Sequence, residues 1–485
     1  MKTSFVKKTG IVLGWIILWS VLVLIINNDI VLVGPVQIIL ALVHNACESE
    51  FYLSILMSLL RIMTGFVAGL LVGGILGIVG YKVKLVKDIL EPFMVTVKAI
   101  PVASFVVLLL IWAGSSKLSF FISFLMVLPQ IYTSMVAGLE SVDPLLIEMA
   151  DGFNYNLWEK AVYVYKDSVS PFLESAVKIS IGLAWKSGVA AEVIGLSDHS
   201  LGSRIYMSKI YLDTANLFAY TLVVILLSFF FEKLVILLLH KVTIIGKPVT
   251  SGGNQVAVSD GNQVAVSGGI TEGVSDGKTE TVKRRMDESN QDSSLDNYLD
   301  LILNYPRGSV EISDINVSFG DEEVLRNYSL SLEDSKSYLL MGESGVGKTT
   351  LLNEIRKRSK KSISMVFQEN RLLEEYDAVT NIVLGHRNLS KDDIRSIAKM
   401  ILPYDCLEKP VKELSGGMKR RVAVLRAMLF ESELLLLDEP FTGIDEENKD
   451  RVIEFIKLYQ RNRTLLVVSH DSEDARGLEA SIIEL

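Results

Sequence analysis

The chain has 485 residues, of which 49% are hydrophobic and 22% charged, and its formal net charge is −9. A chain of this length holds two or more domains, and its acidic balance argues against nucleic-acid binding as the main task. The only two cysteines, Cys47 and Cys406, lie in different halves, so no disulfide framework is indicated. Apolar residues concentrate in about the first 240 positions, which indicates two different bodies joined in one chain.

The N-terminal half contains six apolar stretches long enough to predict transmembrane helices. They cover residues 10–27, 54–80, 93–113, 118–138, 174–195 and 215–239. A cleaved signal peptide is the alternative for the first stretch, but that stretch is long, lacks a small-residue cleavage site and is followed by further spans.

Basic residues in the short loops predict the orientation of these spans. Arg204 and Lys209, in the loop at 196–214, are a mild violation of the positive-inside rule. The basic residues that place the N-terminus in the cytoplasm precede the first span or follow the second: Lys2, Lys7, Lys8, Lys82, Lys84 and Lys87. Six spans return the chain to the same side, so we expect a multi-pass protein of the cytoplasmic membrane, embedded in its lipid bilayer, with both termini inside.

The cytoplasmic loop at 139–173 carries helix signals. Asp143 and Pro144 are typical of a helix start, and Gly152 is typical of a helix end. Asn156 and Glu159 have the spacing of a capping box, which predicts a second short helix. An amphipathic hairpin on the membrane surface is one interpretation, and we favour a docking element for the C-terminal half.

Charged residues within the expected spans need partners or water. Arg61 and Lys98 lie near span ends, where long side chains can reach the membrane surface. Lys186 and Glu192 lie in the fifth span, six residues apart, and therefore project from different faces of a helix. Lys186 is the deepest charge and could attract an anionic solute, with internal salt-bridging or a role in gating as alternatives. The same question of solute contact applies to Glu192.

A segment without aromatic residues follows the last span. Ser, Gly, Asp and Asn dominate residues 246–297, and one hexapeptide occurs at 254–259 and again at 262–267. This composition predicts a disordered tether. We therefore divide the chain into a membrane domain (1–245), a tether (246–297) and a C-terminal domain (298–485).

The segment Gly342–Thr350 matches the pattern of a phosphate-binding loop. It follows an apolar run that predicts a strand and precedes the start of a predicted helix, which is the context that the motif requires. Glycines allow backbone N–H groups to surround a triphosphate, and the helix N-terminus favours negative charge. Lys348 suits the β- and γ-phosphates of ATP, and Thr349 suits Mg²⁺.

Further motifs follow in a pattern of strands alternating with helices, which predicts an α/β layer. A predicted strand ends at Gln368, and an apolar run ends at Asp438 and Glu439. Asp438 suits Mg²⁺, and Glu439 suits a general base for an attacking water. Another buried strand ends at His470.

On these residues the C-terminal half resembles the nucleotide-binding domain of ATP-binding-cassette (ABC) transporters, over nearly all of 309–485. The resemblance implies Phe319 as the adenine-stacking residue, Asp445 as the D-loop acid and His470 as the switch histidine. Gln368 would be the Q-loop residue and a Mg²⁺ ligand, and Asp438 with Glu439 the Walker B pair. The implied nucleotide-binding residues are those of the Walker A loop and the signature: Gly342, Glu343, Ser344, Gly345, Val346, Gly347, Lys348, Thr349, Thr350, Leu414, Ser415, Gly416, Gly417 and Met418. Two features depart from the family: Arg420 stands where glutamine is usual, and the chain ends fifteen residues past His470, so the usual C-terminal helices are short or missing.

The membrane half resembles the permeases of binding-protein-dependent importers, most closely the nitrate, taurine and sulfonate class. The resemblance rests on Lys98–Ser104, on the segments around Trp185 and Glu192, and on Glu148–Ala150 with Pro171, which are similar to the cytoplasmic EAA loop. Asn154 replaces the usual glycine of that loop, and we expect it to tolerate a left-handed backbone. Lys166 and Asp167 replace a Leu-Pro pair.

We therefore expect an all-α polytopic membrane domain of six helices followed by an α/β P-loop NTPase domain of ABC type. The implied activity is ATP-driven import of a small solute, such as a sulfonate or a vitamin precursor, by a homodimer with ATP and Mg²⁺. A separate extracytoplasmic binding protein would deliver the solute, and no nucleic acid takes part. An exporter and a non-transporting signalling ATPase are the alternatives, which the short inner loops and short outer loops respectively disfavour.

Overall fold

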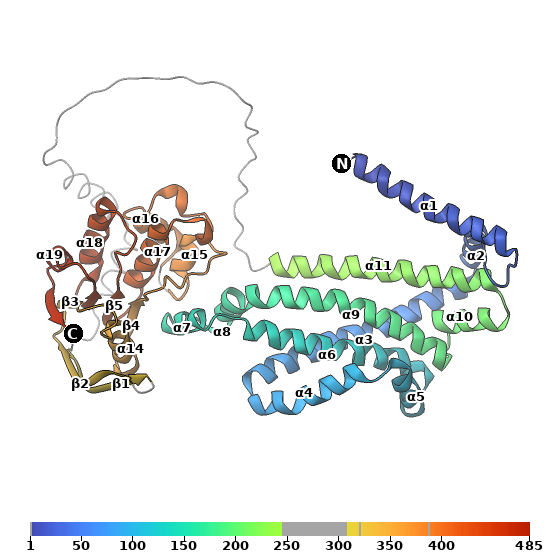
Figure 1. Ribbon diagram of the computed structural model, residues 1–485, viewed down its shortest axis with the longest axis horizontal. Helices are drawn as coiled ribbons and strands as arrows, with labels where there is room; N and C mark the ends of the chain where they lie inside the picture. Colours follow the sequence, from blue (N-terminus) through green and yellow to red (C-terminus); the bar gives the residue numbers. More distant parts are fainter. Residues whose placement is uncertain (1, 245–307, 320–321, 387–388) are drawn as a thin grey trace, which may run out of the picture. The chain divides into compact units, whose positions relative to one another are not determined.

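The computed structural model describes residues 2–244, 308–319, 322–386 and 389–485 (Figure 1). The expected tether at 246–297 lies outside these residues. The structure forms two compact units, and the segment Asp143–Val164 belongs to the same unit as the C-terminal half.

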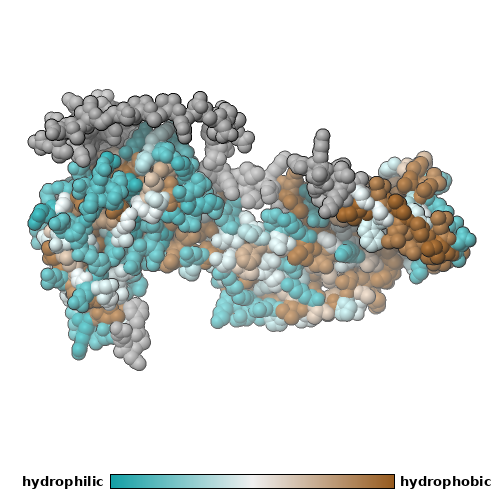
Figure 2. Space-filling view, turned by 45° about the horizontal axis from the view of Figure 1, so that its top comes forward, coloured by the Kyte–Doolittle hydropathy of each residue, from teal (hydrophilic) through white to brown (hydrophobic). Residues whose placement is uncertain are grey.

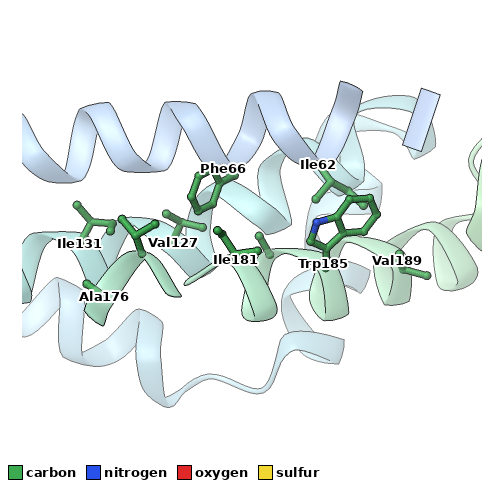
Figure 3. Close-up of a cluster of buried hydrophobic side chains, with 10 residues drawn as sticks. Ile62, Phe66, Val127, Ile131, Ala176, Ile181, Trp185 and Val189 are labelled. Carbon is green, nitrogen blue, oxygen red and sulfur yellow. The ribbon is translucent and has the colours of Figure 1, made fainter. Parts of the chain in front are cut away.

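The membrane half consists of helices. Helices α3, α6 and α9 enclose its largest buried cluster, in which Ile62, Val127, Ile181 and Trp185 meet (Figure 3). Its surface carries many exposed apolar side chains, including Trp15, Leu40, Ile75 and Trp112, whereas the surface of the C-terminal unit is mainly hydrophilic (Figure 2). The helices are α1 (Lys2–Ile26), α2 (Pro35–Asn45), α3 (Ser49–Lys82), α4 (Lys84–Ala99), α5 (Val102–Ala113), α6 (Leu118–Glu140), α9 (Lys166–Gly195), α10 (Leu201–Ile210) and α11 (Thr214–Ile244).

A row of glycines on α3 allows α6 to approach closely. Gly65, Gly69, Gly73 and Gly77 recur at every fourth position and therefore lie on one face of the helix. A Cβ atom added at Gly65 would lie 2.4 Å from the carbonyl oxygen of Phe120 on α6, and one at Gly77 would lie 2.6 Å from Cβ of Met135. Small residues at this spacing are typical of helix pairs in membranes, where close backbone approach provides much of the packing energy.

The six expected spans are only partly supported. Among the described residues, three helices are long and apolar enough to cross a membrane: Ser49–Lys82, Ser115–Glu140 and Thr214–Leu238. The expected span over 93–113 is not one continuous helix, because α4 and α5 are bent by 105° at a break before Val102. Pro101 lies at this break, and a proline disfavours helical geometry in the residue before it. Counting the bent pair as one span gives four.

The segment 143–164 begins as expected. Helix α7 (Pro144–Gly152) is capped by Asp143, whose side chain accepts a hydrogen bond of 2.9 Å from the backbone N–H of Leu145. Asn154 has φ +53°, so it takes the left-handed backbone expected of it. Asn156 and Glu159 form the predicted capping box. The second helix is not short, however, because α8 (Leu157–Glu159) continues through a π-helical stretch (Lys160–Tyr165) into α9.

The C-terminal unit contains a five-stranded parallel sheet in the order β4-β5-β6-β3-β7. Its strands are β3 (Ser337–Met341), β4 (Ile363–Val366), β5 (Leu434–Asp438), β6 (Thr464–Val468) and β7 (Ser481–Glu484). Every residue of β5 and β6 is buried, as expected for continuous apolar runs in a sheet covered on both faces. An antiparallel pair, β1 (Val310–Phe319) and β2 (Glu322–Leu332), forms a separate sheet.

Helices connect the parallel strands and place the motifs at one edge of the sheet. The carboxyl ends of β3, β4, β5 and β6 lead directly into Gly342, Phe367, Glu439 and Ser469. Because parallel strands end at the same edge, these four segments converge, and this edge is where α/β proteins bind ligands. Within the described residues from 308 onward, the α-helices are α14 (Lys348–Arg358), α15 (Ala378–Val383), α16 (Lys391–Ala398), α17 (Gly416–Leu429), α18 (Glu446–Gln460) and α19 (Glu473–Gly477).

Candidate functional site

The phosphate-binding loop lies between β3 and α14, as its motif requires. Gly345 and Gly347 have φ angles of +88° and +107°, a backbone region that favours glycine. Lys348 is only 7% exposed, and its ammonium group donates hydrogen bonds to the carbonyl oxygens of Gly342 (2.8 Å) and Glu343 (2.7 Å). The loop therefore holds a cation at the N-terminus of a helix, which is the arrangement that binds a triphosphate.

Thr349 and Asp438 form a hydroxyl–carboxylate pair. The hydroxyl Oγ1 of Thr349 donates to Oδ2 of Asp438 at 2.8 Å, and Asp438 is 1% exposed. Burial raises the pKa of Asp438 above its ordinary value, although Thr349 and Arg420 both oppose this rise. One hydroxyl and one carboxylate beside a phosphate loop are oxygen donors that suit Mg²⁺, so these residues fit the metal that the resemblance implies.

Glu439 and His470 are brought together by neighbouring strands. Nε2 of His470 lies 2.9 Å from Oε1 of Glu439, and the hydroxyl of Thr442 donates to Oε2 at 3.1 Å. Glu439 has φ +50°, an unusual backbone conformation for a residue other than glycine. The carboxylate of a candidate base is therefore oriented by two side chains at the carboxyl edge of the sheet.

Three other expected site residues, Gln368, Asp445 and Phe319, lie on separate segments. Gln368 lies two residues past the end of β4 and is exposed. The carboxylate of Asp445 caps α18 and accepts hydrogen bonds from the backbone (3.0 Å) and side chain of Asn448. The backbone of Phe319 ends β1, and its side chain lies outside the described part of the structure.

The signature segment forms the start of α17. Ser415 caps this helix, and Ser415 and Gly416 are exposed. Gly417 approaches the backbone closely, because a Cβ atom there would lie 2.6 Å from the carbonyl oxygen of Gly443. The sequence alone singled out Arg420 only as a departure from the family, yet its side chain is buried and contacts the segments that follow β4 and β5.

The segment 143–164 contacts the ATPase through two ion pairs of Glu148. Both oxygens of the Glu148 carboxylate accept hydrogen bonds, one from Arg356 on α14 and the other from Arg371 at 2.8 Å. Burial alone would raise the pKa of Glu148, but the two guanidinium groups hold this pKa below its ordinary value. The docking role favoured for this segment is therefore supported by direct contacts, whose basic partners the sequence did not indicate.

Aromatic contacts complete the docking surface. The ring of Phe153 is 2% exposed, meets the ring of Phe430 at 5.2 Å edge to face, and lies 4.6 Å from the guanidinium of Arg426. Gly385 has φ +83°, and a Cβ atom there would lie 2.2 Å from the carbonyl oxygen of Phe153. Phe153, the residue that follows α7, therefore packs against Gly385, Arg426 and Phe430.

Glu192 and Lys186, the two charges of α9 discussed above, differ in burial. Glu192 is fully buried and accepts hydrogen bonds from the hydroxyl of Ser58 (2.7 Å) and the backbone N–H of Gly202 (3.3 Å), so it ties α9 to α3 and α10. Lys186 lies on a different face of α9, as predicted, and is exposed in the described structure. Arg61 donates to the carbonyl oxygen of Asp198 (3.1 Å) and Lys98 to the hydroxyl of Thr133 (3.0 Å).

Comparisons with known proteins agree with this geometry. Residues 53–243 match the binding-protein-dependent transport system inner membrane component family, and residues 353–442 match the ABC transporter family. The chain is 32% identical to an aliphatic sulfonates import ATP-binding protein of Paracoccus denitrificans (strain Pd 1222), over 36% of this chain and 79% of that protein. It is 30% identical to a thiamine import ATP-binding protein of Histophilus somni (strain 129Pt), over 35% of this chain and 93% of that protein. It is 28% identical to an ergothioneine transport ATP-binding protein of Helicobacter pylori (strain G27), over 36% of this chain and 96% of that protein.

Each half of the chain thus matches a different component of a transport system. The N-terminal match is to a membrane component that works with a solute-binding protein, and the C-terminal match is to the ATPase that drives transport. The chain therefore belongs to the ABC transporters, as an ATP-driven importer that joins a binding-protein-dependent inner membrane component and an ABC ATPase in one polypeptide.

Proposed function

We propose that two copies of this chain form an importer of the cytoplasmic membrane, to which a separate extracytoplasmic binding protein delivers a small polar solute. The observation that carries the proposal is the pair of ion pairs that Glu148 forms with Arg356 and Arg371. It joins a segment between two membrane helices to the ATPase, and one of the arginines, Arg371, lies three residues after Gln368, beyond the end of β4. ATP-dependent movement of this strand end would then reach the membrane helices through α7 and α8.

Each chain contributes one permease and one ATPase, so a complete importer requires a two-fold dimer. In this dimer, the ATP held by Lys348 of one chain is closed by Ser415 of the other. The exposure of Ser415 and Gly416 at the start of α17 is compatible with contact to a partner's nucleotide. Closure of the two ATPases on ATP and reopening after hydrolysis would alternate access to the two sides of the membrane.

Within each site the residues have separable tasks. Lys348 and the backbone of the loop hold the phosphates, and Thr349 with Asp438 would hold Mg²⁺, which neutralises charge on the transferred phosphoryl group. Glu439 accepts a proton from the attacking water, and His470 and Thr442 orient its carboxylate. Gln368 and Asp445 complete the site by position, since phosphoryl transfer depends mainly on positioning and charge stabilisation.

The experiment that tests the importer proposal uses the full chain in liposomes. ATP is placed on the side of the ATPase, and candidate binding proteins loaded with solute are placed on the opposite side. We expect ATP hydrolysis and solute uptake to rise together only when a matching loaded binding protein is present. Export of preloaded solute without any binding protein would favour the exporter, and hydrolysis that responds to a ligand without solute movement would favour a signalling ATPase.

Removing the carboxylate of Glu148 should uncouple hydrolysis from transport. In Glu148→Gln the two arginines lose their shared anionic partner, and we expect uptake to fall about tenfold while basal ATP hydrolysis changes less than about twofold. The contact should persist at neutral pH, because the two arginines hold the pKa of Glu148 below its ordinary value. The matched control is Glu140→Gln, whose carboxylate pairs with Lys87 within the membrane half. Equal loss of uptake in both variants would contradict a specific docking role.

The exposed ammonium of Lys186 supports an anionic solute, such as a sulfonate. Lys186→Gln should then reduce uptake of the sulfonate taurine about tenfold, and Lys186→Arg should retain most of it, because an opposite charge near the solute is worth on the order of 1 kcal/mol. The control is Lys178→Gln on the same helix, whose ammonium pairs with Glu174 at 2.7 Å. If a neutral or cationic solute is transported and Lys186→Gln leaves its uptake unchanged, Lys186 has no part in solute recognition.

A further inference from the structure

Arg420 lies inside the ATPase with its whole guanidinium used in hydrogen bonds. The side chain projects from α17, five residues after the cap of this helix, and is 3% exposed. It donates to four backbone carbonyl oxygens and one side-chain oxygen, those of Phe367, Gln368, Asp438, Glu439 and Asn370. We propose that Arg420 is a positioning residue, which sets the backbone of Glu439 and of Gln368 for ATP hydrolysis.

The acceptors of Arg420 belong to the ends of two neighbouring strands. Phe367 and Gln368 follow β4, and Asp438 ends β5 immediately before Glu439. Strands β4 and β5 pair in parallel up to Val366 and Leu437, so hydrogen bonding between them stops just before these residues. Beyond that point Arg420 bridges the two segments that follow these strands. Its Nη1 lies 2.7 Å from the carbonyl oxygen of Phe367, and its Nη2 lies 2.7 Å from the carbonyl oxygen of Glu439.

The peptide of Glu439 needs such support because of its backbone conformation. A left-handed φ in a residue other than glycine persists only when its surroundings determine it. The N–H of Glu439 donates to the carbonyl oxygen of Val468 on β6 at 3.0 Å. Its carbonyl oxygen accepts from Nε (3.0 Å) and Nη2 (2.7 Å) of Arg420. These two anchors hold the backbone so that the carboxylate meets His470 and Thr442.

The position of Arg420 is one where the family resemblance predicts glutamine. A glutamine amide offers two N–H donors, whereas a guanidinium offers five in a rigid plane. Arginine can therefore hold both strand ends at once, at the expense of burying a cation. A purely structural role is the competing explanation, and Arg463 illustrates it. Its guanidinium is 1% exposed and donates to carbonyl oxygens outside the site, those of Met428, Phe430, Tyr459 and Gln460.

The first test compares Arg420→Met, Arg420→Gln and Arg463→Met in the full-length protein. We would measure the single-turnover rate of ATP hydrolysis at saturating Mg-ATP, the affinity for ATP, and the thermal unfolding midpoint. Arg420→Met should lower the rate about tenfold to a hundredfold, because small displacements of a catalytic group are that costly, while affinity changes less than about threefold. Arg420→Gln should be intermediate, since it keeps part of the donor set. Arg463→Met should lower the unfolding midpoint without lowering the rate of the folded protein.

The second test is a double-mutant cycle with Glu439→Gln, which measures coupling between the two residues. If Arg420 acts through Glu439, adding Arg420→Met to Glu439→Gln should change the residual hydrolysis rate less than about threefold. A full tenfold or larger penalty in that background would overturn the proposal, as would equal behaviour of Arg420→Met and Arg463→Met in the first test. If Arg420→Met does not fold, Arg420→Gln takes its place in both tests, and the same criteria apply.

Discussion

Replacing Glu439 by glutamine should leave ATP binding intact and lower single-turnover hydrolysis about a hundredfold to ten-thousandfold, the usual contribution of a general base. The amide is nearly isosteric with the carboxylate but cannot accept the proton of the attacking water. Lys348, Thr349 and Asp438 still hold the phosphates and the metal in this variant. The protein should therefore accumulate as a closed dimer with uncleaved ATP.

The measurement is ADP formation from radiolabelled ATP in a single turnover, with size-exclusion chromatography to follow the closed dimer. Glu479→Gln is a matched control, because Glu479 pairs with Lys457 in the last turn of α18 and takes no part in the proposed site. The control should hydrolyse at the parental rate. Hydrolysis near the parental rate in Glu439→Gln itself would exclude Glu439 as the base.

A dimer that combines Lys348→Ala in one chain with Ser415→Arg in the other should recover hydrolysis at one of its two sites. Under the shared-site proposal, each variant alone forms dimers in which both sites are broken. In the mixed dimer one site collects both lesions, and the other pairs an intact Lys348 with an intact Ser415. The expected gain over either single-variant dimer is about a hundredfold in single-turnover rate.

Doubly tagged dimers, purified through both tags in succession, provide the mixed species for this measurement. Single-turnover ADP formation is the appropriate readout, because one intact site need not sustain repeated cycles. A dimer of two Lys348→Ala chains carrying the same two tags is the control for purification. If each site were built within one chain, the mixed dimer would contain no complete site. Absence of hydrolysis in correctly assembled mixed dimers would then argue against sites shared between chains.

Features that depend on neighbouring residues in the chain could be predicted from the sequence. The caps at Asp143 and Asn156 and the left-handed turn at Asn154 depend on contacts across two to four residues, and the structure contains all three. The phosphate-binding loop is equally local, because Gly345, Gly347 and Lys348 carry its conformation and charge within one strand–loop–helix unit. Continuous apolar runs also predicted the buried strands that end at Asp438 and before His470, since both faces of such strands are covered.

Contacts between distant parts of the chain could not be predicted in this way. Glu148 meets Arg356 and Arg371 across more than 200 residues, and nothing in the local pattern around these arginines distinguishes them from surface charges. The bend between α4 and α5 was also missed. Residues 93–113 are apolar on average, and an average over the stretch does not show that Pro101 interrupts the helix.

The sequence by itself therefore determined the class of chemistry, the order of the two halves and the place of the phosphate-binding-loop motif between a strand and a helix. Its local motifs suffice for this, because each places a few polar groups on a short segment of backbone. Only the tertiary structure decided which strand ends adjoin, in the order β4-β5-β6-β3-β7, and so which motifs share one edge. That order also decides the partners of Arg420, because its guanidinium can bridge Gln368 and Glu439 only when β4 and β5 are neighbours.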